Sequence, residues 1–368
     1  MRIVTVVGNR PQFVKAAAVS GPLRAEHEEV LIHTGQHHDE TLSRVFFSEL
    51  GLARPDRELG IAGATNTSQT ARMLTALEPL FGELRPDAAL VYGDTNSTLA
   101  GALAAAQADV PVVHVEAGMR SFDRTMPEEL NRVLTDHCSK LLLCSSEHAA
   151  ENLRNESVAG RVEVVGDVMI DVAERWRPRA LTDDATLDAY GLSAGEYLVL
   201  TAHRAGNVDD PSRLAALVEL IETLPGPVVF PLHPRTRARL ETARLYERLE
   251  RIDGLRLTEP LGYVEFTALL CRAQAVVTDS GGVQKEAYLA GVPCVTLREN
   301  TEWTETVDAG WNTLVGLDWA AALAALDAPR PAERPPLYGD GHAAERCVRA
   351  IGALRTGERS AARTPAAE

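Results

Sequence analysis

Three carboxylates follow apolar stretches in the first half of the chain. Asp94 ends the segment VYGD, Glu116 lies in VVHVEAG, and Glu128 opens the segment EELNR. Burial beside valines makes a charged carboxylate costly, so its presence there indicates that its charge or its proton is used. Helix capping and ion pairing are the alternative interpretations. If the three groups act chemically, they are suited to proton transfer.

The strongest signal for an anion is the segment VVTDSGGVQKEAYLAG in the second half. Ser280, Gly281 and Gly282 follow a predicted strand and begin a predicted helix, where free N–H groups and the helix dipole attract a diphosphate. Glu286, about one helical turn further on, is placed to accept hydrogen bonds from ribose hydroxyls. A tight turn capped by the Ser280 hydroxyl is the alternative.

Two further loops carry cations after a predicted strand. The segment GNRPQFVK brings Arg10 and Lys15 to the start of a helix, although it departs from the dinucleotide motif GxGxxG. A solvated loop with two surface cations is the alternative. The segment TAHRAGN places His203 and Arg204 at the end of a strand, where a structural histidine is the competing interpretation.

These loops need elements to position them, and the sequence predicts an α/β fold. Short valine-rich stretches alternate with helical patterns, which favours parallel sheets covered on both faces. Pro, Asp and Gly accumulate between 173 and 196, which indicates a domain boundary. We expect two doubly wound Rossmann-like domains. The predicted parts are an N-terminal domain with the acids (1–172), a linker (173–196), a C-terminal diphosphate-binding domain (197–338), a helix packing back on the first domain (339–355) and a disordered tail (356–368).

Ligands of open parallel sheets bind beyond the carboxyl ends of the strands. The acids of the first domain are therefore expected to face the phosphate-binding turn of the second domain across a cleft. Acids that face a diphosphate suggest bond chemistry on the group that the diphosphate carries.

Composition excludes several classes of protein. A formal net charge of −15 and a pI near 5.2 argue against nucleic acid or an anionic membrane as the partner. The start MRIVTVVGNR is too short and too charged for a signal peptide or a membrane span. Five cysteines without a CxxC pair favour reduced thiols and a cytoplasmic protein. His37 and His38 lack the spacing of a helical zinc site, so we expect no metal.

Several motifs in order resemble the non-hydrolysing UDP-N-acetylglucosamine 2-epimerases. They are GDTNSTLAG, HVEAGMRS, MPEELNR, TAHR, TDSGGVQKEA and RENTEWTETVDAG, and the resemblance covers nearly the whole chain. It implies a fold of the glycosyltransferase B type, usually a homodimer, acting on a UDP-sugar without metal or nicotinamide. The catalytic residues that it implies are Asp94, Glu116, Glu128 and His203. The residues expected to bind UDP are Arg10, Lys15, Arg204, Phe266, Ser280, Gly281, Gly282 and Glu286.

The implied reaction interconverts UDP-N-acetylglucosamine and UDP-N-acetylmannosamine. UDP would be eliminated to give a 2-acetamidoglucal, and would add back after a proton returns to the opposite face of C2. Three alternatives stay open. They are a hydrolysing 2-epimerase that releases UDP and N-acetylmannosamine, a glycosyltransferase of the same fold, and a non-catalytic UDP-sugar sensor.

The chain departs from the usual family pattern in several places. Asn9 and Gln12 replace the frequent Thr and Glu of the first loop, and Trp303 stands where Arg is frequent. Gln36 is present, but Asp39 occupies the position of a second glutamine associated with activation by substrate, so we expect weak or absent activation. The altered loops also leave open a modified sugar, such as a deoxy or diacetamido derivative.

Overall fold

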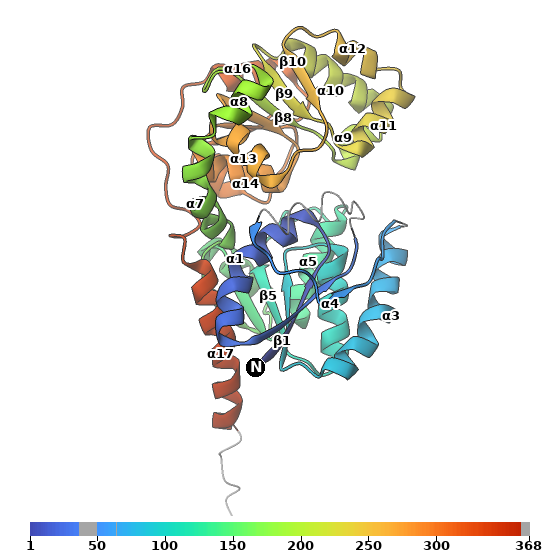
Figure 1. Ribbon diagram of the computed structural model, residues 1–368, viewed down its shortest axis with the longest axis vertical. Coiled ribbons are helices and arrows are strands. Elements are labelled where there is room, and N and C mark those ends of the chain that lie inside the picture. Colours follow the sequence, from blue (N-terminus) through green and yellow to red (C-terminus); the bar gives the residue numbers. More distant parts are fainter. Residues whose placement is uncertain (37–49, 64, 362–368) are drawn as a thin grey trace, which may run out of the picture. The chain divides into compact units, whose positions relative to one another are not determined.

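The computed structural model describes residues 1–36, 50–63 and 65–361, with side chains described to residue 354 (Figure 1). His37, His38 and Asp39 lie outside the described residues. The chain divides into two compact units. Unit 1 comprises Met1–Val172 and Pro336–Glu368, and unit 2 comprises Ala173–Pro335.

Unit 1 contains a parallel sheet of seven strands in the order β3-β2-β1-β4-β5-β6-β7. The order changes direction at β1, whose neighbours are β2 and β4. This is the doubly wound arrangement in which loops at the carboxyl ends of the central strands carry the site. The strands are β1 Arg2–Val7, β2 Glu28–His33, β3 Arg57–Glu58, β4 Ala88–Tyr92, β5 Val112–Ala117, β6 Leu141–Cys144 and β7 Arg161–Val164.

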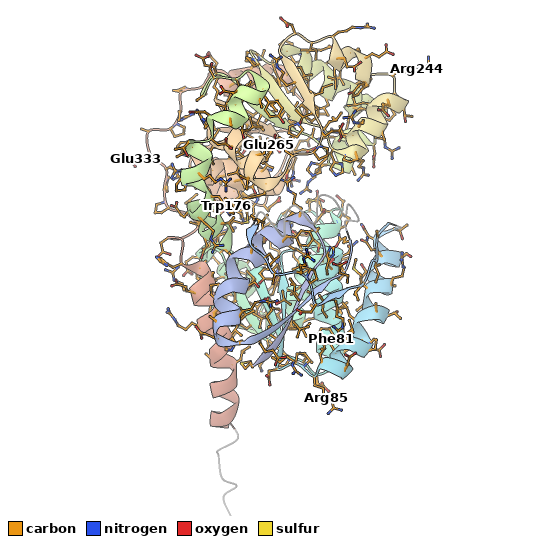
Figure 2. All side chains as sticks on the ribbon, in the orientation of Figure 1. Phe81, Arg85, Trp176, Arg244, Glu265 and Glu333 are labelled. Carbon is orange, nitrogen blue, oxygen red and sulfur yellow. The ribbon has the colours of Figure 1, made fainter. Side chains whose placement is uncertain are left out.

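Several helices of unit 1 cover this sheet with an apolar side. In α3, Met73, Leu77 and Phe81 recur at helical spacing and are buried, whereas Arg85 ends the helix at the surface (Figure 2). Helix α4 packs between α3 and α5, and α1 packs against the C-terminal helix α17. The bounds are α1 Arg10–Glu26, α3 Asn66–Leu84, α4 Asn96–Gln107, α5 Pro127–Cys138, α6 Glu147–Asn155 and α17 Ala343–Ala361.

Unit 2 contains a parallel sheet of six strands in the order β10-β9-β8-β11-β12-β13. Alternate residues of β8 serve opposite faces: Leu198 and Leu200 pack in the core that includes α10, while Val199 packs in the core that includes α13. The sheet is thus buried on both sides. The strands are β8 Leu198–Thr201, β9 Val228–Pro231, β10 Leu255–Thr258, β11 Ala275–Thr278, β12 Cys294–Thr296 and β13 Asn312–Leu314.

The helices of unit 2 are mostly short connections between these strands. Helix α7 begins in unit 1 and ends in unit 2, so the predicted linker contains the end of α7 and all of α8. The bounds are α7 Val168–Leu181, α8 Asp184–Tyr190, α9 Ala205–Val208, α10 Pro211–Thr223, α11 Pro234–Thr242, α12 Tyr246–Glu250, α13 Tyr263–Cys271, α14 Gly281–Ala290, α15 Thr304–Asp308 and α16 Trp319–Asp327.

Helix α17 begins after the loop that returns from unit 2 and continues past the point where the sequence predicts a tail. Residues 356–361, which the sequence assigns to the tail, continue the helix. Near its start, Asp171 accepts hydrogen bonds from the main-chain N–H groups of Ala343 and Ala344. Within the described residues, no helix combines the length and the apolar character needed to cross a membrane.

Candidate active site

Asp94 lies in the turn between β4 and α4, and its carboxylate does not cap the helix. Thr95 is the N-cap and forms a capping box with Thr98, which satisfies the first N–H groups of α4. The carboxylate of Asp94 instead accepts a hydrogen bond from Arg132 at 2.5 Å, and its side chain is 33% exposed. The capping interpretation is therefore wrong for Asp94, which keeps one side open to solvent.

Glu116 interrupts the end of β5. Its φ angle is +68°, in the left-handed region, and the pairing of β5 with β6 shifts between Val115 and Ala117. A left-handed conformation costs a non-glycine residue free energy, and such strain is concentrated at functional sites. The carboxylate pairs with the ammonium group of Lys15 from α1, and both side chains are largely buried. Two predicted site residues are thus in direct contact.

Glu128 and Glu129 are adjacent in the first turn of α5 but have different surroundings. Glu129 is buried and accepts hydrogen bonds from Ser121 N, Ser121 Oγ and Phe122 N at 2.9 to 3.0 Å. Glu128 is half-buried and has no hydrogen bond or ion pair among the described residues. Glu129 therefore shapes the loop before α5, and the carboxylate of Glu128 is available to a ligand.

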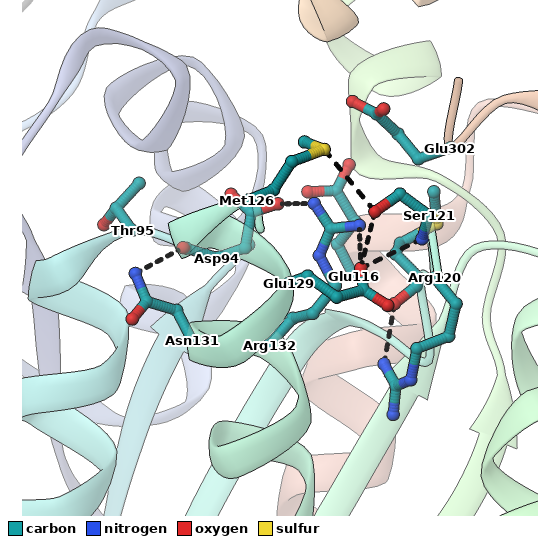
Figure 3. A network of polar contacts seen from close by, with 12 residues as sticks. Asp94, Thr95, Glu116, Arg120, Ser121, Met126, Glu129, Asn131, Arg132 and Glu302 are labelled. Atoms are coloured by element: carbon teal, nitrogen blue, oxygen red, sulfur yellow. Dashed lines mark hydrogen bonds and ion pairs between the residues drawn. The ribbon is translucent and has the colours of Figure 1, made fainter. Parts of the chain in front are cut away.

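Arg132 forms hydrogen bonds with the carboxylates of both Asp94 and Glu129 (Figure 3). Its guanidinium group donates to Asp94 Oδ2 at 2.5 Å and to Glu129 Oε2 at 3.1 Å, and its side chain is 2% exposed. Leu130, two residues before Arg132, faces solvent. The side-chain amide of Asn131 donates a hydrogen bond to the main-chain oxygen of Asp94 at 3.0 Å. Helix α5 therefore fixes the Asp94 turn by two contacts.

The first loop explains the two departures from the family pattern. The Asn9 side chain accepts from Gln12 N and caps α1, a position at which Thr is also a preferred residue. The buried amide of Gln12 accepts from Gly8 N at 2.7 Å and donates to Tyr92 O at 2.9 Å. An ionised Glu could not make the second bond. Arg10 is half-buried at the first position of α1.

In unit 2, a buried carboxylate arranges the loop after β8. Asp279 accepts from the main-chain N–H groups of His203 and Arg204 at 2.9 to 3.0 Å and from the amide of Asn207 at 3.2 Å. The ring of His203 stacks on His233 at 5.3 Å and stays partly exposed. His203 and Arg204 are thus brought to the end of β8, where the sequence places them.

Helix α14 begins directly after Ser280, where the sequence predicts the start of a helix. Ser280 is the N-cap, but its hydroxyl makes no capping hydrogen bond, so the capped-turn alternative is wrong. The first N–H groups of a helix have no acceptor within it. Gly281 is buried beneath Glu302: a Cβ atom there would lie 2.1 Å from Glu302 Oε1. Glu302 in turn pairs with Arg298 at 3.0 Å, and Arg204 lies 3.8 Å from it.

Two further residues singled out in the sequence are buried. Phe266, on α13, is 4% exposed and packs in the core of unit 2, so its contact with UDP stays a prediction. Trp303 is buried, and the ammonium group of Lys285 lies 4.3 Å from its ring centroid, a cation–π contact. Glu286 is half-buried one turn into α14.

The sequence missed four residues that organise these groups. Glu129 and Arg132 follow Glu128 in the motif MPEELNR. The motif does not indicate their role, which depends on their burial on α5. Asp279 directly precedes Ser280 in the segment VVTDSGGVQKEAYLAG, and no local pattern indicates that it accepts the hydrogen bonds that shape the His203 loop. His114, within the motif HVEAGMRS, is the fourth.

The two parallel sheets and the residues at their strand ends define a protein of the glycosyltransferase B type with two Rossmann-like domains. This confirms the predicted fold class. A crystal structure of Methanocaldococcus jannaschii UDP-GlcNAc 2-epimerase in complex with UDP-GlcNAc and UDP superposes with a TM-score of 0.90 at 39% identity, covering 96% of this chain and 99% of that chain.

Residues 23–352 match the profile of the family described as UDP-N-acetylglucosamine 2-epimerase. A UDP-N-acetylglucosamine 2-epimerase homolog of Methanococcus maripaludis is 44% identical over 95% of this chain and 99% of its own. The UDP-2,3-diacetamido-2,3-dideoxy-D-glucuronate 2-epimerase of Pseudomonas aeruginosa is 44% identical over 96% of this chain and 100% of its own. The chain belongs to the UDP-N-acetylglucosamine 2-epimerase family.

Proposed function

We propose that this protein interconverts UDP-N-acetylglucosamine and UDP-N-acetylmannosamine without releasing free sugar. The observation that supports this most is the set of three carboxylates in unit 1. Lys15 holds Glu116 and Arg132 holds Asp94, whereas Glu128 has no cation in the described structure. Glu128 can therefore take up or release a proton without breaking an ion pair, which suits an acid–base pair with unequal roles.

The chemistry requires such a set of acids because the C2 hydrogen of the sugar is not next to a carbonyl group. The C1–O bond breaks first, and its electron pair leaves on UDP. A carboxylate then removes the C2 proton, and the C1–C2 double bond of a 2-acetamidoglucal forms. A proton returns to the opposite face of C2, and the UDP oxygen adds back to C1. Atoms and electrons balance, and the product is the epimer.

The departing UDP carries negative charge, which needs stabilisation. In our proposal the N–H groups at the start of α14 bind the diphosphate, and Arg10, Arg204 and His203 supply further cationic or hydrogen-bonding groups to it. Glu286 accepts hydrogen bonds from the ribose. We propose that Asp94, Glu116 and Glu128 serve the sugar ring.

Proton NMR in deuterated water tests the reaction directly. The purified protein is incubated with UDP-N-acetylglucosamine, without added metal or nicotinamide. We expect the C2 proton signal to disappear and UDP-N-acetylmannosamine to form. Free N-acetylmannosamine together with UDP would place the protein in the hydrolysing class. Absence of both exchange and products would contradict turnover of this substrate.

Substitution of single acids separates an enzyme from a UDP-sugar sensor. Glu116→Ala and Glu128→Gln should abolish turnover and leave the affinity for UDP, measured by calorimetry, within a factor of about two, since UDP contacts other residues. In a sensor, neither substitution would change a measurable reaction. A homodimer in the cytoplasm also stays a prediction, and light scattering of the purified protein tests the dimer.

A second substrate is supported by one comparison. The Pseudomonas aeruginosa relative that is 44% identical is named for a UDP-diacetamido-glucuronate, and the altered first loop of this chain is compatible with a modified sugar. The two substrates differ at C3 and C6, away from the C2 position that reacts. We propose comparing kcat/KM for both UDP-sugars, and a larger value for the glucuronate would assign this chain to that substrate.

A further inference from the structure

His114 lies in β5, two residues before Glu116, and is fully buried. Both of its ring nitrogens face an oxygen at 2.7 Å. Nδ1 lies opposite Asp136 Oδ1, and Nε2 lies opposite the main-chain oxygen of Gly93. A carbonyl oxygen can only accept a hydrogen bond, so Nε2 must carry a proton.

The surroundings of Asp136 determine the state of the other nitrogen. Asp136 Oδ2 accepts from Arg120 Nη1 at 2.7 Å and from Gly118 N at 3.2 Å. The guanidinium group of Arg120, which is always charged, and the Gly118 N–H group both favour the ionised form of the Asp136 carboxyl. An ionised Asp136 only accepts hydrogen bonds, so Nδ1 must carry a proton as well.

The charges of the cluster balance when the His114 ring is an imidazolium. Arg120 also makes a bidentate pair with Glu156, both distances being 2.7 Å. Two carboxylates, one guanidinium and one imidazolium sum to zero. With a neutral ring, the fully buried Asp136 carboxylate would have to share the Arg120 guanidinium with Glu156, which is 30% exposed. Uncompensated buried charge is strongly unfavourable.

This cluster joins the two strand ends that carry catalytic acids. The Gly93 carbonyl belongs to the peptide bond that leads into Asp94, and Gly118 lies two residues after Glu116. Gly93, Glu116 and Gly118 all have positive φ angles, between +63° and +79°. Contacts must hold such a backbone in place. A Cβ atom on Gly93 would also lie 3.3 Å from Glu116 Oε2, so the two strand ends are close together.

We infer that His114 is a positioning residue: as a doubly protonated bridge between Gly93 and Asp136, it sets the separation of Asp94 and Glu116 on which proton transfer at C2 depends. The inference rests on the proposed function for its catalytic part. Its structural part, a buried imidazolium that spans two strand ends, is independent of the substrate.

The kinetic test compares His114→Gln with the matched control His137→Gln. His137 lies on the same helix as Asp136, is about half exposed, and is 3.8 Å from Glu156. We expect His114→Gln to lower kcat about 100-fold, because small displacements of reacting groups have effects of this size. The affinity for UDP should stay within a factor of about two, since UDP contacts other residues. His137→Gln should behave as the unmodified protein.

If a folded His114→Gln protein keeps a kcat within about threefold of that of the unmodified protein, the positioning role is overturned. An equal loss of kcat and of UDP affinity would also overturn it, because that pattern indicates general disruption of the fold. If His114→Gln does not fold, Asp136→Asn takes its place. This substitution keeps the shape of the side chain and removes the charge that holds the His114 ring. It should lower kcat as His114→Gln does and leave the affinity for UDP unchanged.

The structural part has its own measurement in the unmodified protein. Long-range ¹⁵N–¹H NMR of the histidine rings should show two N–H protons on His114 that exchange slowly with water. A single N–H proton would overturn the imidazolium bridge. If the protein binds UDP but does not epimerise either UDP-sugar, the proposed function fails, and this NMR result still decides the structural part.

Discussion

The adjacent glutamates at the start of α5 allow a sharp test of the structure. Glu129→Gln should destabilise unit 1. Glu129 Oε2 accepts from Ser121 N, Ser121 Oγ and Arg132, while Oε1 accepts from Phe122 N. A glutamine can place its oxygen where Glu129 has Oε2, but its NH₂ group then takes the place of Oε1 and faces the N–H group of Phe122. One hydrogen bond to a charged group and the ion pair with Arg132 are lost, which together cost about 2–4 kcal/mol.

The four tryptophans provide a probe that separates the units. Trp176, Trp303, Trp311 and Trp319 all lie in unit 2, so their fluorescence reports on that unit. Far-UV circular dichroism reports on both units. With a slope of about 2 kcal/mol per M urea, Glu129→Gln should lower the midpoint of the unit 1 transition by about 1–2 M. The fluorescence transition should change less.

Glu128→Gln is the matched control, since it changes the same chemical group one residue away. Glu128 has no hydrogen bond or ion pair among the described residues, so its free energy of unfolding should change by less than about 0.5 kcal/mol. Its turnover should be lost. A Glu129→Gln protein as stable as the unmodified one, or a Glu128→Gln protein less stable by more than about 1 kcal/mol, would refute the roles assigned to the two residues.

Three further predictions concern residues outside α5. Gln12→Glu replaces an amide donor by a carboxylate that faces the main-chain oxygen of Tyr92. It should lower the free energy of unfolding by about 1–3 kcal/mol, which a calorimetric scan would show as a thermal midpoint several degrees lower. Gly281→Ala should destabilise unit 2 by about 1–3 kcal/mol in fluorescence-monitored urea unfolding, because its Cβ collides with Glu302, whereas Gly282→Ala has room and should not. Because the pKa of Asp136 is lowered in the folded protein, its ionised form stabilises the fold above its ordinary pKa of 3.8, and this stabilisation is lost as the pH falls through the folded value. The thermal midpoint should therefore fall steeply below about pH 4, and Asp136→Asn should flatten this dependence.

The fold class could be predicted from the sequence because the signals are local. Valine-rich strands and amphipathic helices alternate along the chain, and parallel sheets follow from that order. The loops after β1, β4, β5, β8 and β11 could be selected for the same reason, since each follows a visible strand. The extent of α17 could not be predicted, because its sequence past residue 355 is polar and resembles a tail.

The roles of individual charged groups could not be predicted from the motifs. Glu128 and Glu129 are identical in type and adjacent in position, and only the phase of α5 buries one of them. Successive residues of a helix point about 100° apart, so neighbours meet different surroundings. His114 reads as one more residue of an apolar strand, and its partner Asp136 lies on a helix that packs on that strand only in the folded unit.

Helix α17 has a consequence for synthesis on the ribosome. Unit 1 includes the residues from Pro336 onward, and its core contains Cys347 and Ile351 of α17, both fully buried. The N-terminal part of unit 1 emerges first, but this helix emerges only after the whole of unit 2. Until α17 has been synthesised, unit 1 therefore has an uncovered apolar surface beside α1. Unit 2 has all of its strands by then. A stop codon before α17 would remove part of the support of the acid-bearing sheet and leave every residue of the predicted diphosphate site in place.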